Sequence, residues 1–236
     1  MTAAPGALVL EIHGLRKNYG GLRPLRLQAL TIGPGERVAV AGIDGPAAEL
    51  LVNLVTGATL PEDGTIRAFG RNTADIADGD QWLASLDRFG IMSDRAVLLE
   101  GSTLAQNLAM PFTLEIDPVA PAMLATVSEL AEECGIAAEW LSQPAGAIPP
   151  EVRARAHLAR AVAMAPQLLV LEHPTASVAE PDRADLAADI VRVCERRRLA
   201  ALAITLDEPF ARAIAHRVLV LNGATGELNE RRRGWW

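Results

Sequence analysis

The stretch VAVAGIDGPAAELLVNLVTG, residues 38–57, decides how this chain is interpreted. Its first apolar run predicts a buried strand, its glycines predict a turn, and the apolar run that follows predicts a helix ending at Gly57. Strand, glycine turn and helix in this order are typical of a phosphate-binding loop, whose motif is Gly-x-x-x-x-Gly-Lys-Ser/Thr. Aligned on Gly42 and Gly45, the motif falls on Gly42, Ile43, Asp44, Gly45, Pro46, Ala47, Ala48 and Glu49.

The two residues of the motif that contact phosphate and metal are absent. Ala48 stands where the motif has lysine, and Glu49 stands where it has the hydroxyl that binds magnesium. A carboxylate about 4 Å from a phosphate repels it by ~4 kcal/mol at an effective dielectric constant of about 20, or roughly three orders of magnitude in affinity. We therefore expect the outline of a phosphate loop without its chemistry. Restoring both residues, by Ala48→Lys with Glu49→Ser, is expected to improve nucleotide binding.

Composition narrows the classes of protein. The chain has 236 residues, of which half are hydrophobic and 22% are charged, as in a globular α/β domain. A net charge of −7 argues against a general nucleic-acid binder, which needs clustered Lys and Arg. No apolar run approaches the ~20 residues that span a bilayer, and no signal peptide is indicated, so a cytoplasmic location is expected. Cys134 and Cys194 match no metal spacing and are expected to be reduced core residues.

Predicted strands and helices alternate along most of the chain, which favours parallel βαβ units. The strands are predicted at 7–15, 25–32, 36–43, 64–70, 89–93, 167–174, 200–205 and 217–223, and the helices at 48–57, 80–86, 103–111, 120–136, 151–166, 181–198 and 208–216.

Four stretches in order carry a resemblance to a known family. They are LRKNYGGLRPL at 15–25, VTGATLPEDGTIRAFG at 55–70, LARAVAMAPQLLVLEHPTASV at 158–178 and AIAHRVLVLNGATGEL at 213–228. Together they make the chain, from Leu8 to about Leu228, similar to the ATP-binding subunit of ABC transporters. The resemblance implies one domain over residues 1–236 with the P-loop NTPase-like ABC ATPase fold. That fold has a parallel-sheet core, an antiparallel β subdomain and a helical subdomain, here at approximately 95–160.

At the family's catalytic positions this chain has other residues. The resemblance places Asp94 where a glutamine faces the γ-phosphate, and Glu172 and His173 where an aspartate and the catalytic glutamate stand. It places Leu206 at the switch histidine and Ala179 at a conserved loop aspartate of the family. Glu172 could still bind magnesium, whereas His173 replaces the carboxylate that positions the attacking water. We expect Glu49 and Asp94 to face the phosphates with no cation to offset them.

The family's signature motif, Leu-Ser-Gly-Gly-Gln, falls on Ile148, Pro149, Pro150, Glu151 and Val152. In the family this motif binds the partner subunit's γ-phosphate through a hydroxyl, backbone N–H groups and a helix N-terminus. The two prolines remove N–H donors and Glu151 adds a charge of the wrong sign. We therefore expect no hydrolysis at this site.

Several residues keep two interpretations. Tyr19 is either the aromatic on which adenine stacks in the family or an ordinary surface or core tyrosine. His173 is either a new base or metal ligand or a structural histidine. The tail RRRGWW, residues 231–236, either lies on a membrane surface or is frayed.

The resemblance and the losses together predict an ABC transporter ATP-binding-protein-like subunit that is catalytically degenerate, a pseudo-ATPase with a structural or regulatory role in a membrane transport complex. Two other functions stay open: an active ATPase subunit that energises transport, and a scaffold protein without a transporter. No cofactor is expected, and ATP and magnesium are the ligands of any residual binding. The implied partners are a permease and a second ATPase subunit or another copy, with the chain peripheral to the membrane at its cytosolic face.

The segment RAVLLEG, residues 95–101, is predicted to be a loop that carries apolar side chains. In the family, the groove beside this loop receives a helix of the permease. We expect Val97, Leu98 and Leu99 to contact the partner, with burial of these residues in the core as the alternative.

Overall fold

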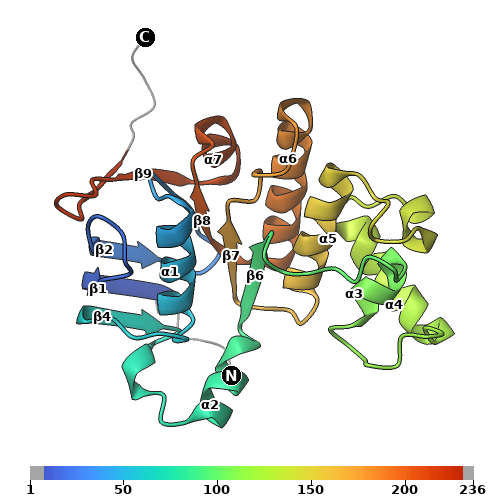
Figure 1. Cartoon of the computed structure of the whole chain (residues 1–236), viewed down its shortest axis with the longest axis horizontal. Helices are drawn as coiled ribbons and strands as arrows, with labels where there is room; N and C mark the ends of the chain where they lie inside the picture. The colour runs from blue at the N-terminus through green and yellow to red at the C-terminus, as the bar shows by residue number, and fades with distance from the viewer. Residues whose placement is uncertain (1–7, 231–236) are drawn as a thin grey trace.

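The computed structural model describes residues 8–230 and contains two sheets flanked by helices (Figure 1). The antiparallel sheet has the strand order β2-β1-β4-β5, and the larger sheet has the order β10-β9-β3-β8-β7-β6. The strands are β1 (Leu10–Lys17), β2 (Leu25–Ile32), β3 (Arg37–Ala41), β4 (Asp63–Ala68), β5 (Arg71–Asn72), β6 (Phe89–Ser93), β7 (Leu168–Glu172), β8 (Ala200–Thr205), β9 (Arg217–Leu221) and β10 (Leu228–Glu230). The helices are α1 (Gly45–Val55), α2 (Gly79–Leu86), α3 (Leu104–Ala109), α4 (Pro121–Glu133), α5 (Pro150–Val162), α6 (Glu180–Arg197) and α7 (Glu208–Ile214).

Strands β9, β3, β8, β7 and β6 are parallel, as the alternation of strands and helices predicted. Every residue of β7 and of β8 is buried, because both faces of this sheet are covered. In β7, Leu168 and Val170 face the core between the two sheets, whereas Leu169 and Leu171 face the helices on the other side. Strand β10, which pairs antiparallel with β9, was not predicted, because its three residues carry too short a pattern.

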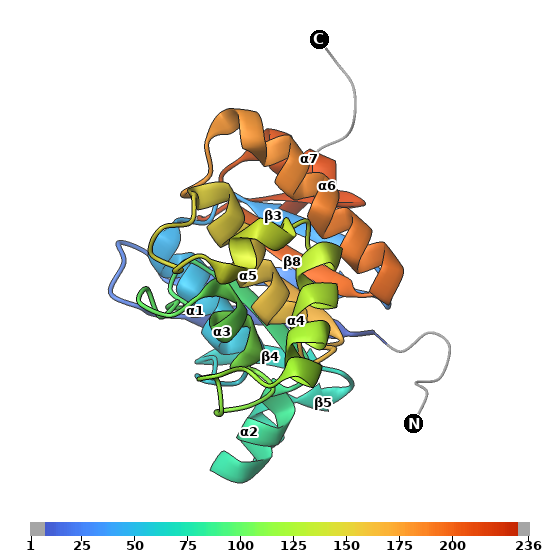
Figure 2. The same ribbon diagram turned by 90° about the vertical axis from the view of Figure 1, so that its right-hand side faces the viewer.

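Helix α1 lies between the two sheets (Figure 1). Its residues Leu51, Leu54 and Val55 are fully buried against side chains of both sheets. The opposite face of the parallel sheet is covered by α5 and α6, with α3 and α4 farther out (Figure 2). The N-terminus of α1 therefore lies at the carboxyl end of β3, where open α/β sheets place their ligands.

Helices α3 and α4 lie within the ranges predicted for them, 103–111 and 120–136. Thr103 forms a capping box with Gln106 at the start of α3. Gly135, with a φ of 78°, follows the end of α4. Cys134 and Cys194 are free and buried in the helix-covered core, as predicted. The prediction for the tail at 231–236 lies outside the described residues.

Candidate functional site

The first turn of α1 occupies the place of the phosphate loop. Residues 45–48 are already helical, and the Ala48 N–H donates to the carbonyl oxygen of Asp44 at 2.8 Å. The Asp44 carboxylate caps the helix and accepts from the Ala47 N–H at 3.0 Å. Pro46 has no N–H to offer. The helix N-terminus, which would otherwise bind an anion, is therefore already bound to a carboxylate of the chain itself.

The two aligned positions that follow point in different directions. Ala48 is fully buried, so the side chain aligned with the lysine points into the core between the sheets. Glu49, one residue on, is half-exposed and its carboxylate lies on the open side of α1.

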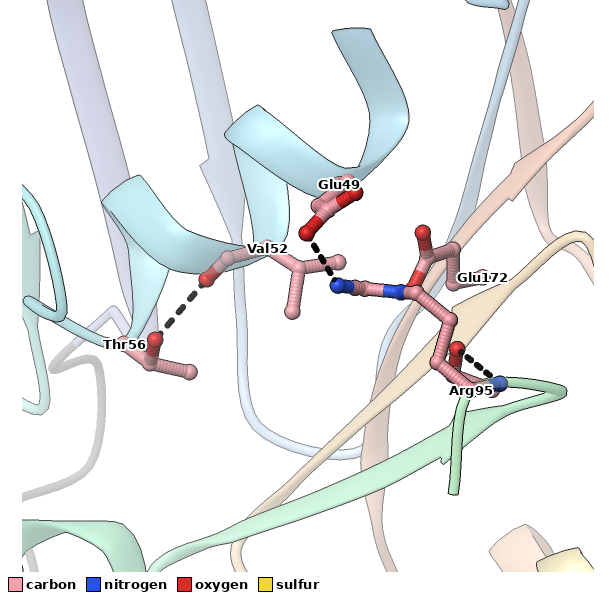
Figure 3. Close-up of polar contacts among 6 residues, drawn as sticks. Glu49, Val52, Thr56, Arg95 and Glu172 are labelled. Atoms are coloured by element: carbon pink, nitrogen blue, oxygen red, sulfur yellow. Dashed lines mark hydrogen bonds and ion pairs between the residues drawn. The ribbon is translucent and has the colours of Figure 1, made fainter. Parts of the chain in front are cut away.

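Arg95 joins Glu49 to Glu172 (Figure 3). Its Nη1 lies 2.6 Å from Glu49 Oε1, and its Nη2 lies 2.6 Å from Glu172 Oε2. Its Nε also donates to Glu172 Oε2, at 3.2 Å. The Glu172 side chain is 8% exposed, whereas that of Arg95 is 46% exposed. The guanidinium thus neutralises a buried carboxylate and a half-exposed one together.

This arrangement corrects the expectation that Glu49 has no cation nearby. The three side chains come from α1, from the turn after β6 and from the end of β7, so no local pattern connects them. The feature of the sequence that could have indicated a cation here is that Arg95 directly follows Asp94, a residue expected to face the phosphates. Asp94 itself is exposed in the turn after β6.

The donor set does not fit a magnesium nucleotide. The oxygen Oε2 of Glu172 accepts from two N–H groups of Arg95, so it is unavailable to a cation unless that arginine moves. The Asp44 carboxylate accepts from the Ala47 N–H, one of the helix N-terminal donors that a phosphate would need. Within residues 8–230, no group of three or more His, Cys, Asp and Glu side chains is placed to hold a metal ion.

His173 and Leu206 lie together on a cleft of about 400 Å³ that Gly45 also lines. The His173 backbone has a φ of 43°, and its buried Nε2 has no hydrogen-bond partner. Leu206 is exposed, so an apolar side chain faces solvent at this position. Ala179 is the N-cap of α6 and offers no capping side chain.

Tyr19 lines a second cavity, of about 730 Å³, beside the first turn of α1. Asp44 and Ala47 form part of the wall of this cavity. Partial burial, with a smaller contribution from the Asp44 charge, raises the pKa of the Tyr19 phenol. The ring also packs against the core between the sheets. The position of Tyr19 is compatible with both interpretations, because the residue lines the cavity and also packs against the core.

The residues aligned with the signature motif begin α5. Pro149 is the N-cap and Pro150 follows it, and no side chain caps the helix. Ile148 and Val152 are buried, and Glu151 lies in the first turn. This helix end offers fewer N–H donors than an ordinary one and adds a negative charge.

The segment proposed for partner contact is only partly exposed. Val97 is 76% exposed and Leu99 is 44% exposed, but Leu98 is 4% exposed and belongs to the helix-covered core. Leu98 therefore does not belong to an exposed contact surface, because its side chain is buried in that core. Leu104 and Leu108, one helical turn apart on α3, are fully buried.

A groove of about 430 Å³ lies between β6 and α5, and one of its lining residues, Arg160, donates a hydrogen bond to the Val97 carbonyl oxygen. Met110, Met164 and Ala96 line its apolar part. His157 also lines it, and burial lowers the pKa of this imidazole. The buried Nδ1 of His157 has no hydrogen-bond partner.

No helix within residues 8–230 has the length and apolarity to cross a membrane.

The family model described as "ABC transporter" matches residues 25–176, well over half of the chain. Among curated relatives, "Fe(3+) ions import ATP-binding protein FbpC 2" of Rhodococcus jostii is 28% identical over 214 residues, covering 90% of this chain and 59% of that protein. "Sulfate/thiosulfate import ATP-binding protein CysA 2" of Chromobacterium violaceum is 29% identical over 216 residues, covering 90% of this chain and 56% of that protein. The chain thus spans less than two thirds of the length of these relatives.

Two solved structures show the same fold. The dimeric structure of MJ0796, described as a bacterial ABC transporter cassette, superposes with a TM-score of 0.77 at 19% identity, covering 96% of this chain and all of that one. CbiO1 from Clostridium perfringens, part of the transporter complex cbiONQ, gives 0.77 at 18% identity, covering 94% of this chain and 87% of that one. The fold expected from the resemblance is confirmed.

Proposed function

Because the chain belongs to the ABC transporter family, we propose that it is an ATP-binding-protein-like subunit of a membrane import complex that does not itself hydrolyse ATP. The two relatives described above are named as import ATP-binding proteins of iron and of sulfate or thiosulfate systems. The names agree on the class of complex and on import as its direction. They differ in the transported substrate, so we assign no substrate to this chain.

The observation that carries the proposal is the bridge from Arg95 to Glu49 and Glu172. Phosphoryl transfer depends on cations and N–H donors placed around the transferred group. Here the Arg95 guanidinium is bound to two carboxylates of the protein, and the Ala47 N–H in the first turn of α1 donates to the Asp44 carboxylate. His173 and Leu206 supply no carboxylate for water and no switch histidine.

The partner surface of this subunit is the exposed pair Val97 and Leu99, together with the groove lined by Met110 and Met164. We assign a cytosolic segment of the permease as its occupant, because the relatives named above serve import systems. Apolar side chains as exposed as these favour contact with another protein. The protein is then held at the membrane by its partner.

Phosphate release by the purified protein, with magnesium and ATP, tests the proposal. The expected turnover equals the background of the buffer. Glu172→Gln, prepared in parallel, is the control for a contaminating ATPase. Turnover that survives repurification and changes in Glu172→Gln would support the alternative of an active ATPase subunit. If the protein is inactive and no permease co-purifies with it, the scaffold alternative is favoured.

A further inference from the structure

Arg95 ties together three parts of the chain that are far apart in sequence. It belongs to the turn after β6, while its two carboxylate partners lie on α1 and at the end of β7. β6 and β7 pair directly, with Ser93 opposite Glu172, so the turn begins beside one of these partners. The ion pair to Glu49 extends this connection to α1 (Figure 3).

The burial of Glu172 makes this connection costly to break. Its carboxylate lies almost entirely out of solvent, and an unpaired buried charge is strongly destabilising. The planar guanidinium uses separate N–H groups for the two carboxylates, which a single ammonium group cannot do equally well. Arg95 is therefore held in one position by both of its partners.

The same segment is bound at its other end to the helices between β6 and β7. Nη1 of Arg160, on α5, donates to the Val97 carbonyl oxygen at 2.7 Å. The Asn107 side chain, on α3, accepts from the Leu99 N–H at 2.7 Å and donates to the Leu99 carbonyl at 3.1 Å. Leu98, between them, is buried in the helix-covered core. Residues 95–99 are thus fixed at one end by the ion pairs of Arg95 and at the other by hydrogen bonds from α3 and α5.

We propose that Arg95 replaces bound nucleotide as the link that fixes residues 94–103 to α1 and β7, so that Val97 and Leu99 are presented in one position at all times. This inference rests on the proposed function, in which no nucleotide sets the position of the segment. A permease would then meet a docking surface whose shape does not vary with ATP.

Hydrogen exchange of the whole chain, measured without nucleotide and without a partner, tests the link. In Arg95→Gln, amides of residues 94–103 are expected to exchange about tenfold faster, while those of β3 and β8 keep their protection. Arg95→Lys is expected to cause a smaller increase, because its ammonium group retains one ion pair. Arg16→Gln is the matched control, since Arg16 has similar exposure and one ion pair, to Asp63 at 3.0 Å.

Unchanged exchange at 94–103 in Arg95→Gln would overturn the inference. So would an equal increase in Arg16→Gln, or an increase spread over the whole chain in both Arg95 variants. Because no nucleotide is present, ATP hydrolysis by the protein would contradict the proposed function without changing this result.

Discussion

Nη2 of Arg95 lies 2.6 Å from Oε2 of Glu172, and this ion pair joins the turn after β6 to the end of β7. Since the same guanidinium also meets Glu49, the carboxylate that would repel phosphate is already neutralised. We therefore expect weak nucleotide binding, because a nucleotide would compete with an internal ion pair and the lysine of the motif is missing.

ATP with magnesium is expected to bind more weakly than about 1 mM, or with less than about 4 kcal/mol of binding free energy. A phosphate would have to displace the Asp44 carboxylate from the first turn of α1. Titration calorimetry on the purified chain measures this affinity. A dissociation constant in the micromolar range would contradict the prediction.

Ala48→Lys combined with Glu49→Ser is now expected to fail as a rescue, in contrast to the expectation from the sequence. Ala48 is fully buried, so a lysine there places a long charged side chain in the core between the sheets. We expect the double variant to lose several kcal/mol of unfolding free energy and therefore to melt at a lower temperature. We expect no gain in ATP affinity. Thermal melts and calorimetry measure both effects.

The single variant Glu49→Ser is the control for that experiment, since the Glu49 side chain is half-exposed. Its melt is expected to change little. If instead the double variant melts like the wild type and binds ATP tightly, the buried placement of position 48 does not hold in solution.

Val97→Asp and Leu99→Asp are each expected to abolish co-purification with the permease. Both side chains are exposed, so the unfolding free energy of the isolated protein should change by no more than about 0.5 kcal/mol. Leu114→Asp is the matched control, because Leu114 is also exposed but lies in another loop. Pull-down and thermal melt are the measurements.

A collapsed melt in Leu99→Asp would place that residue in the core and remove it from the docking surface. Equal loss of binding in Leu114→Asp would show that the effect is one of charge alone. Leu98→Asp, by contrast, is expected to lower the melting temperature strongly, since Leu98 is buried.

The stability of the protein is expected to fall at alkaline pH through its two thiols. Burial raises the pKa of Cys134 and of Cys194 from 9.0 to about 12. The folded protein keeps these protons after the unfolded chain has released them, so the stabilisation is complete below pH 9 and is lost progressively up to about pH 12. Urea unfolding over this range measures the loss.

Comparison with Cys134→Ala/Cys194→Ala isolates the two thiols from the Tyr19 phenol, which also titrates at alkaline pH. The wild type should lose more unfolding free energy than this variant between pH 8 and pH 11. Parallel pH profiles for the two proteins would show that the thiols titrate normally in the folded state.

Most elements of the fold are determined locally and were therefore predictable. The apolar runs of β7 and β8, the capping box at Thr103 and the glycine after α4 each act within a few residues of sequence. Their alternation predicts a parallel sheet. The three residues of β10 pair only because β9 lies beside them, so short-range signals could not reveal that strand.

The same distinction between local and tertiary causes applies to the residues of the site. The sequence by itself determined which groups are missing, since the identities of Ala48, His173 and Leu206 do not depend on the fold. Tertiary structure decided what the remaining groups do: it turned Ala48 and Leu98 inward and left Val97 exposed. It also brought residues 49, 95 and 172 within 2.6 Å contacts, because the guanidinium of one is the counterion of two carboxylates on distant elements. Ion pairs of this kind depend on the distance between charges in space. The order of strands and the packing of helices determine that distance, and separation along the sequence does not reveal it.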